Sequence, residues 1–496
     1  MKTRLLLILF AAFCALSSYA FVVGDANGDG KIDVADITAV ASKILGNNPE
    51  SFNQDAADAN QDGKIDVADI TTIACIILKS DDVDDNTVVI TYNGSNADVK
   101  VAKNIASYLT PSVDGANVTI TADESLDTEL TYKLSGASEN GSFTLNSSCK
   151  CIIELNGVAL TAQNVPAVDI EDGKKISIVV SGENAFADTD ANTGKAAFYV
   201  KGHAEIEGDG VINITGNAKH AYSSKEYTQL KKKFTGSFNI LASASDGIHV
   251  GQYYQQNQGQ VVISNIAGDG IQVEAAADGE DNDGCVIFKD GSLDITVTGI
   301  ACDGIKADSL VNISGGTIKI VNNGGAEYNT KKEKVSGSAC ISGSAFKLES
   351  GDISLRATGA GGKGISVDES ATFTGGKTEV VTLGDVFEAN DDDTKPQAIK
   401  SDLDIIINSG EVYTYSLYGK GFSYDDEGTG RFYINGGTAL AVGEKKSETN
   451  GGTQVVQTFT KQKITEGNTY EFGGVSFTVP AGFNHSSAKI MTSKAE

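Results

Sequence analysis

The stretch SDGIHV at residues 245–250 returns as GDGIQV at 268–273 and as CDGIKA at 302–307. Each copy places an aspartate before a glycine, a common turn pair, and an apolar residue after it. Units of this kind recur at similar intervals along the chain, with longer intervals where a loop is inserted. Related units, some weaker, begin at Ala167, Ala197, Ala221, Ala345, Gly364, Ala398 and Gly421.

Short alternating segments such as VVITY, ISIVV, VINIT and LDITV lie between these units and are typical of strands. A period of about 23 residues, with strand, turn, strand and turn, matches one coil of a parallel β-helix. An antiparallel sandwich of this length normally divides into domains, and propeller blades repeat at about 40–45 residues. We therefore predict a mainly β fold, a right-handed parallel β-helix (solenoid), preceded by a small α-helical EF-hand-like module.

An acidic sequence occurs twice near the start, as GDANGDGKIDVADIT at 24–38 and ADANQDGKIDVADIT at 57–71. Counted from the first aspartate, oxygen ligands fall at positions 1, 3, 5, 7, 9 and 12 and glycine at position 6, the spacing of an EF-hand-type calcium loop. Position 7 ligates through its backbone carbonyl, so lysine is compatible there. A solvated acidic turn is the alternative, but from the first aspartate onward the two copies differ at a single position. We predict Ca²⁺ ligands at Asp25, Asn27, Asp29, Lys31, Asp33 and Asp36, and at Asp58, Asn60, Asp62, Lys64, Asp66 and Asp69.

Each loop is followed, but not preceded, by an amphipathic helical pattern. This duplicated loop–helix unit resembles the type I dockerin of cellulosomal proteins over residues 24–79. The resemblance implies a module that folds with calcium bound and binds a cohesin domain on a scaffold protein. Loop positions 10 and 11, which largely set partner choice in that family, are Val34, Ala35, Val67 and Ala68 instead of hydroxyl-bearing residues. The cohesin is therefore not identified, and a calcium-stiffened cap or spacer is the alternative role.

The later repeats resemble a second family. The segments YKLSG (132–136), IIELNGVAL (152–160) and GDGVINITGNAKH (208–220), followed by SDGIHV and GDGIQVE, are similar to the secreted calcium-dependent carbohydrate-binding β-helix family related to pectate lyases. The resemblance runs from about residue 88 to at least 440. It implies binding of plant cell-wall polysaccharide, including acidic pectic chains.

Asp246, Asp269 and Asp303 each precede a corner glycine, so stacking would align their carboxylates about 4.8 Å apart. Carboxylates this close repel unless a cation or hydrogen bonds neutralise them. Calcium ligation by these three residues, with Glu274 and Asp308 nearby, is one interpretation. Ordinary Asp-Gly turn chemistry is the other. Protein-bound calcium could also bridge this acidic chain, of net charge −27, to a polyuronate.

The sequence predicts a secreted protein whose chain divides into five segments. Residues 1–20 have the charged start, apolar run and small cleavage residues of a signal peptide. The net charge of −27 disfavours nucleic acid as a partner, and no later stretch is apolar enough to span a membrane. We expect a secreted or cell-surface protein. After the signal peptide we expect a dockerin-like module at 21–79, an acidic linker at 80–87, a carbohydrate-binding β-helix domain at 88–440 and a β-rich C-terminal cap at 441–496.

The function predicted from these features is calcium-dependent binding of a pectic or cellulosic polysaccharide, with docking to a cohesin-type partner, in polysaccharide degradation. The alternatives are a β-helix polysaccharide lyase or glycoside hydrolase, and a structural cell-surface protein. A lyase would need a base such as Arg356, Lys306 or Lys347, but nothing in the sequence singles one out. Catalytic and carbohydrate-binding residues stay unknown. The histidines are scattered and are interpreted as structural: His203, His220, His249 and His485.

Overall fold

The chain forms two compact units, residues 1–88 with 99–111, and residues 89–98 with 112–496. The predicted signal peptide lies outside the described residues, as do residues 81–82 of the predicted acidic linker. The computed structural model describes residues 22–80, 83–192, 194–276, 281–425 and 428–495.

The first unit contains three described helices, α2 (Val34–Ile44), α3 (Gln54–Ala57) and α4 (Val67–Leu78). α2 begins at Asp33, whose side chain accepts the Ala35 N–H, while the Asp36 carboxylate accepts the Asp33 N–H. This reciprocal capping fixes the point where the first acidic loop becomes a helix. α2 and α4 pack together around a small core of Ala26, Ala39, Val40, Ala57, Ala59 and Ile73.

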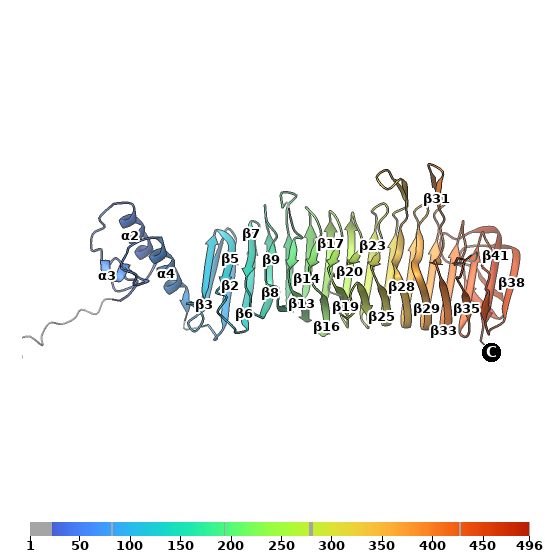
Figure 1. Cartoon of the computed structure of the whole chain (residues 1–496), viewed down its shortest axis with the longest axis horizontal. Helices are drawn as coiled ribbons and strands as arrows, with labels where there is room; N and C mark the ends of the chain where they lie inside the picture. Colours follow the sequence, from blue (N-terminus) through green and yellow to red (C-terminus); the bar gives the residue numbers. More distant parts are fainter. Residues whose placement is uncertain (1–21, 81–82, 193, 277–280, 426–427, 496) are drawn as a thin grey trace, which may run out of the picture. The chain divides into compact units, whose positions relative to one another are not determined.

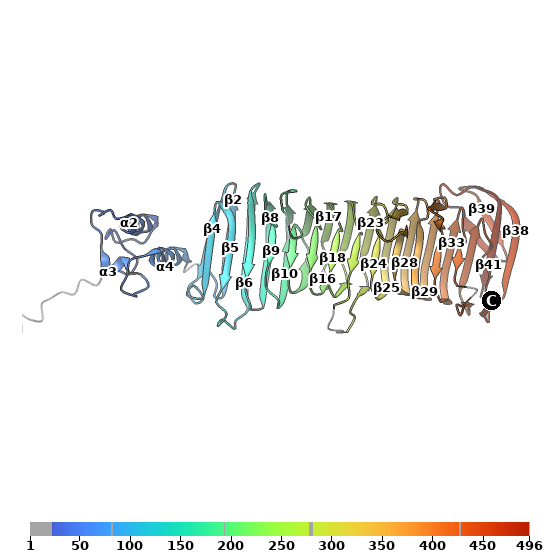
Figure 2. The same ribbon diagram turned by 45° about the horizontal axis from the view of Figure 1, so that its top comes forward.

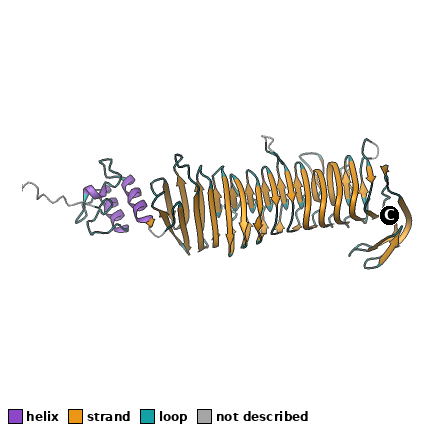
Figure 3. Cartoon of the chain, turned by 90° about the horizontal axis from the view of Figure 1, so that it is seen from below, coloured by secondary structure: helices purple, strands orange, loops and turns teal. Residues whose placement is uncertain are grey.

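Strands make up nearly all of the remaining regular structure (Figure 3). Up to residue 224 they are β1 (Lys79–Ser80), β2 (Thr87–Asn93), β3 (Asn96–Ala102), β4 (Leu109–Asp114), β5 (Ala116–Ala122), β6 (Leu130–Ser138), β7 (Gly141–Asn146), β8 (Cys151–Thr161), β9 (Val168–Ile170), β10 (Lys175–Ser181), β11 (Glu183–Ala187), β12 (Phe198–Val200), β13 (His203–Gly208), β14 (Val211–Gly216) and β15 (Tyr222–Ser224).

The strands of the central part follow. They are β16 (Thr228–Phe234), β17 (Ser237–Ser243), β18 (Ile248–Val250), β19 (Tyr253–Gln256), β20 (Gln260–Ile266), β21 (Ile271–Val273), β22 (Cys285–Phe288), β23 (Ser292–Val297), β24 (Ile305–Ala307), β25 (Leu310–Asn322), β26 (Glu327–Asn329), β27 (Lys334–Ser336), β28 (Ala339–Ala357) and β29 (Lys363–Thr382).

The last strands are β30 (Phe387–Ala389), β31 (Asp392–Thr394), β32 (Ile399–Ser401), β33 (Asp404–Ser416), β34 (Phe422–Ser423), β35 (Phe432–Ile434), β36 (Thr438–Gly443), β37 (Gly451–Gly452), β38 (Val456–Ile464), β39 (Thr469–Phe472), β40 (Val475–Thr478) and β41 (His485–Lys494).

In the second unit most strands of the large sheet pair in parallel with their equivalents one repeat later, so successive strands lie side by side (Figure 1). The series that carries the candidate site is β9, β12, β15, β18, β21, β24 and β28. A second series is β10, β13, β16, β19, β22 and β25. The third, β11, β14, β17, β20 and β23, also ends in β25. The same succession is visible in the turned view (Figure 2).

The prediction of an open right-handed β-helix solenoid is wrong. The fold is mainly β with few helices, and its parallel strands form a closed, barrel-like wall around the core. Long strands such as β25 and β28 continue round corners and pair with more than one series, which joins 35 of the described strands into one sheet. The sequence period indicates which residues return beside one another. Closure depends on how the backbone crosses the corners, which the period does not encode.

Glycine occupies one corner in successive repeats, at Gly316, Gly351, Gly376 and Gly410, with φ between +68° and +103°. A Cβ at Gly376 would lie 2.6 Å from the Gly351 carbonyl oxygen, so the corner has no room for a side chain. The end of the wall is covered differently. Residues 441–496, predicted as a β-rich cap, include β41, which pairs antiparallel with β36 and β38 around buried Phe477 and Phe483.

Candidate functional site

In the first acidic loop, the carboxylates accept hydrogen bonds from backbone N–H groups of the same loop. Asp25 accepts the Asp29 and Gly30 N–H groups at 3.0 and 2.9 Å. Asp36, which is fully buried, accepts the Asn27 and Asp33 N–H groups at 3.0 and 2.8 Å. This donor set consists of oxygens around a left-handed Gly30, which fits a calcium ion. Among described residues, no lysine or arginine forms an ion pair with a loop carboxylate.

The second loop repeats the first almost atom for atom. Asp58 accepts the Asp62 and Gly63 N–H groups at 3.1 and 2.8 Å, and buried Asp69 accepts the Asn60 and Asp66 N–H groups. One position differs: Gly28 of the first loop is Gln61 in the second, and both have positive φ, +73° and +59°. The predicted ligand sets therefore have matching surroundings, and their role in binding calcium stays a prediction.

The predicted partner-binding residues are accessible. Val34 is 67% exposed and Val67 is 65% exposed, and Ala35 and Ala68 beside them are also exposed. Each apolar pair lies at the first turn of its helix, α2 or α4. This exposure is what the predicted partner-binding role requires, and that role stays a prediction.

The structure brings together Asp246, Asp269 and Asp303, here called the carboxylate ladder. Backbone hydrogen bonds from Gly247 to the Asp269 carbonyl, and from Gly270 to the Asp303 carbonyl, place them on successive repeats. Oδ1 of each carboxylate accepts the next backbone N–H along the ladder. The acceptor distances are 2.9 Å from Asp269 N, 2.6 Å from Asp303 N and 2.7 Å from Ala339 N.

The Oδ2 atoms of the ladder face side chains of neighbouring positions. Lys306 Nζ lies 3.1 Å from Asp269 Oδ2, and the Ser342 hydroxyl donates to Asp303 Oδ2 at 2.6 Å. Burial and the adjacent Asp269 raise the pKa of Asp303 to about 6. Burial also raises the pKa of Asp269, against the opposing effect of Lys306. The predicted calcium ligation by the ladder stays a prediction, and protein groups already occupy each of its oxygens.

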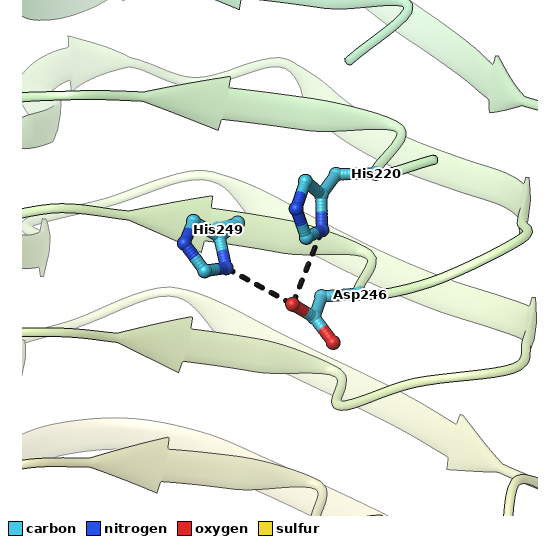
Figure 4. A group of neighbouring side chains, drawn as sticks. All are labelled: His220, Asp246 and His249. Carbon is cyan, nitrogen blue, oxygen red and sulfur yellow. Dashed lines mark hydrogen bonds and ion pairs between the residues drawn. The ribbon is translucent and has the colours of Figure 1, made fainter. Parts of the chain in front are cut away.

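Two histidines extend the ladder at Asp246 (Figure 4). His249 Nδ1 lies 2.9 Å and His220 Nδ1 lies 3.1 Å from Asp246 Oδ2, and the two rings stack with centroids 4.3 Å apart. Burial would raise the pKa of Asp246, but the two rings and the Asp269 N–H outweigh it and hold the pKa well below its usual range. The sequence contained a signal for His220, which precedes the corner residue Ala221 as Asp246 precedes Gly247.

A surface pocket of about 660 Å³ borders these histidines. Strand register explains why several lysines gather at this pocket. Phe198 of β12 pairs with Tyr222 of β15, so Lys195 and Lys201, which flank β12, lie near Lys219 and Lys225, which flank β15. Lys195 is bound to Asp169 and Glu171, and Lys201 lies 3.7 Å from Glu171. The pocket is lined by Lys195, Lys201, Lys219, Lys225, Tyr199, Glu171, Glu226 and Glu274, among others.

Lys219 and Lys225 differ from their neighbours. Both are exposed, and neither forms an ion pair with any described residue. They therefore present two positive charges without an ion-pair partner in a chain of net charge −27. A larger pocket, of about 880 Å³, is lined by Tyr92, Phe186 and mainly small residues, with Glu139 as its one Asp, Glu, Lys or Arg. That lining gives an anionic ligand no cationic partner.

The three candidate bases considered from sequence are engaged elsewhere. Arg356 donates to the Ala481 carbonyl at 2.8 Å, Lys306 pairs with Asp269, and Lys347 pairs with Glu349 at 2.5 Å. Tyr253 stacks on Tyr227 with ring centroids 4.7 Å apart, which occupies faces that could otherwise contact a sugar.

A family model described as "Carbohydrate-binding domain-containing protein" matches residues 114–385, more than half of the chain. The chain belongs to this family. The pocket and the carboxylate ladder both lie inside residues 114–385, the segment that this family model matches. A second model, the dockerin type I domain, matches residues 23–78, which include both acidic loops. The resemblances drawn from the sequence are confirmed at this level.

A similar solved structure is the gadolinium derivative of a polysaccharide lyase-like protein from C. thermocellum. It is 19% identical, with 48% of this chain and 92% of that chain covered and a TM-score of 0.40. No curated protein matches the chain.

Together the two domains identify a polysaccharide-associated protein of the cellulosomal type, and dockerin-containing components of that kind are extracellular or attached to the cell surface. Type I dockerins generally bind calcium and imply a scaffold partner that carries cohesin. No helix among the described residues is long and apolar enough to cross a membrane.

Proposed function

We propose that this is a secreted, calcium-dependent polysaccharide-binding protein that docks through residues 23–78 to a cohesin-type partner and holds plant cell-wall glycan during its degradation. Of the pectic and cellulosic glycans, an acidic pectic chain suits the pocket better. The observation that carries this choice is the pair of exposed, unpaired lysines, Lys219 and Lys225, inside the family-matched segment.

Lys219 and Lys225 offset the repulsion expected between this acidic chain and an acidic glycan. A chain of net charge −27 repels a polyuronate at long range. Within about 8–10 Å, the screening length at ordinary salt, local charges dominate over the distant ones. Two ammonium groups at the two ends of β15 can therefore each bind a uronate carboxylate, while hydroxyls of the sugar find polar partners in the same pocket.

Calcium has a separate role in this proposal. It holds the two acidic loops in the form that presents Val34 and Val67, which would insert into the partner's surface. Chelation should therefore abolish attachment to the partner. Its effect on glycan binding measures how much of the recognition passes through calcium and how much through the lysines.

The test is co-sedimentation of the full chain with insoluble polygalacturonate and with cellulose, in calcium and in EGTA. We expect Lys219→Glu with Lys225→Glu to weaken polygalacturonate binding at least about tenfold, since two charge-assisted contacts become repulsive. Lys150→Glu with Lys289→Glu makes the same change in net charge at two exposed lysines outside the pocket and should bind as wild type. Equal losses in the two double variants would contradict the pocket. Formation of unsaturated uronide, followed by its ultraviolet absorbance, would instead indicate a lyase.

A further inference from the structure

Three side chains from two adjacent repeats converge on one point of the pocket wall. His220 comes just before β15, Asp246 just before β18, and His249 from β18 itself. In the described part of the chain, they are the one group of three His, Cys, Asp or Glu residues whose ligand atoms all lie within 4.8 Å of one another. His220 and Asp246 are buried, with 8% and 6% exposure.

The spacing of these atoms is that of ligands around a single ion. Two ligands held about 2.0–2.2 Å from a tetrahedral Zn²⁺ lie about 3.3 Å apart. The separations from Asp246 Oδ2 to the two Nδ1 atoms are 3.1 and 2.9 Å, within a few tenths of that value. Only a small outward relaxation of the rings is needed to admit the ion.

The polar atoms of the cluster are incompletely satisfied without an ion. His220 Nδ1 is buried and makes no well-aligned hydrogen bond, although it lies 3.1 Å from Asp246 Oδ2. A buried donor or acceptor without a partner costs about 1–3 kcal/mol. A metal would use the lone pair of this nitrogen directly.

The surroundings orient the ligands as those of a metal centre do. Asp246 Oδ1 is fixed by the Asp269 N–H at 2.9 Å, which leaves Oδ2 directed at the histidines. Without a metal, His249 Nδ1 donates its hydrogen to Asp246 Oδ2 at 2.9 Å. His249 Nε2 lies 3.7 Å from Glu274 Oε2, so this carboxylate would favour a hydrogen on Nε2 once a metal takes the lone pair of Nδ1. Both histidines line the 660 Å³ pocket, so a fourth coordination position faces accessible space.

We propose that His220, Asp246 and His249 bind a first-row transition-metal dication of the Zn²⁺ class, with an open position toward the pocket. The ligand chemistry separates this site from the calcium loops, because imidazole nitrogen suits Zn²⁺, Co²⁺ or Ni²⁺ while Ca²⁺ takes oxygen ligands. The open position would accept an oxygen donor such as water, a carboxylate or a sugar hydroxyl. The site rests on geometry alone and does not require the proposed polysaccharide binding.

The experiment titrates the full chain with Zn²⁺ by calorimetry after saturation with Ca²⁺, so that the acidic loops are filled. Co²⁺ in its place gives visible absorption that reports nitrogen ligation. We expect one Zn²⁺ per chain, at least about 100-fold weaker binding in His249→Ala and in His220→Ala, and about tenfold weaker binding in Glu274→Gln. His485→Ala is the matched control, because His485 faces one carboxylate, Glu444 at 2.7 Å, and should change nothing.

Retention of zinc affinity in His249→Ala, or no zinc uptake by the wild type, would overturn the proposal. His249 is the more exposed of the two histidines, so its replacement is the variant least prone to misfold, and its melting temperature without zinc checks this. Zinc should raise the melting temperature of the wild type and leave that of His249→Ala unchanged.

Discussion

The calcium loops and the carboxylate ladder both concentrate acidic groups, yet they neutralise them differently. In the loops, the carboxylates of Asp25 and Asp36 receive backbone N–H groups, and among described residues no cationic side chain pairs with them. In the ladder, Asp269 faces Lys306, and Asp303 accepts the Ser342 hydroxyl. The same residue type therefore has only backbone donors in one unit and obtains a cationic or hydroxyl side chain as partner in the other.

The difference follows from how each structure is built. In a loop, the predicted ligands lie within twelve consecutive residues, and the one lysine among them is placed to ligate through its backbone carbonyl. In the stacked strands, each position has neighbours from the repeats before and after it. A lysine one repeat away can therefore lie against an aspartate, as Lys306 does.

Removal of calcium should produce the largest difference in stability between the acidic loops and the stacked strands. We expect EGTA to abolish the cooperative unfolding of residues 22–78 and the helical signal of α2 and α4, because the loop carboxylates then repel one another. The strands should keep their melting transition, since the ladder has its own partners. Calorimetry and far-ultraviolet circular dichroism of the full chain measure both transitions.

A matched variant makes the result specific. Asp36→Asn keeps the size of a fully buried side chain but removes a charged ligand, and it should weaken calcium uptake by the first loop alone. A large fall in the melting temperature of the strands in EGTA would contradict the comparison and would support calcium ligation by the ladder.

Replacement of the ladder's lysine comes next in expected effect. Lys306→Met keeps the aliphatic length but leaves Asp269, which is 8% exposed, without its cation. Removing one partner of a buried ion pair costs about 3–5 kcal/mol. Lys306 is 44% exposed, so we expect a smaller loss, about 2–3 kcal/mol in the free energy of unfolding by urea.

Lys319→Met is the control for this variant. Lys319 Nζ lies 3.0 Å from Asp294 Oδ2, nearly the same distance, but both side chains are exposed, so the cost should be below about 1 kcal/mol. Equal costs in the two variants would show that Lys306 does not neutralise the ladder. Restoration of the Lys306→Met protein by added calcium would show that the ladder can take a metal in place of its lysine.

The extent to which sequence predicts these sites depends on how local they are. The predicted loop ligands lie close together in the chain, so spacing alone was enough to propose Asp25 to Asp36 and Asp58 to Asp69, and their calcium ligation stays a prediction. The ladder was also visible, because Asp-Gly returns with the repeat. The side chains that contact the ladder and line the pocket beside it could not be predicted in the same way. His220, Lys219 and Lys225 meet their neighbours through strand register, which joins positions one repeat apart that no single motif contains.

The fold shows the same limit. The repeat predicted parallel strands returning beside one another, and each strand of the site series pairs in parallel with the next. The predicted solenoid was wrong because β25 and β28 turn corners as continuous strands within a closed wall. Corner geometry depends on a few φ values, such as +71° at Gly376, that a strand period does not specify.

The ladder should also show a characteristic pH dependence. Burial and Asp269 raise the pKa of Asp303 to about 6, above the value near 4 of an unfolded aspartate. Its contribution to stability is therefore fully present below about pH 4 and is lost as pH rises through about 6. Asp303→Asn keeps an acceptor for the Ala339 N–H but removes this charge. The variant should gain about 2 kcal/mol relative to wild type between pH 4 and pH 8.

Urea unfolding of the wild type and of Asp303→Asn at several pH values gives the difference in their free energies of unfolding. The contributions of other titrating groups, which both proteins share, cancel in this difference. A constant difference between wild type and Asp303→Asn from pH 4 to pH 8 would contradict an elevated pKa at Asp303. The loops supply the internal reference, since Asp36→Asn should alter calcium uptake without producing the same dependence in the strands.

The smallest effect distinguishes the two calcium loops from each other. Gln61 has φ +59°, in the left-handed region, where the first loop has Gly28 at φ +73°. A non-glycine residue in this region costs about 1 kcal/mol. Gln61→Gly should therefore stabilise the second loop by about 0.5–1 kcal/mol, less the additional chain entropy of glycine in the unfolded state. Gly28→Gln should weaken the first loop by a similar amount, and the pair of opposite changes is measured from calcium affinity loop by loop. If both substitutions shift affinity in the same direction, backbone strain is not what separates two loops whose sequences otherwise agree from the first aspartate to the start of the helix.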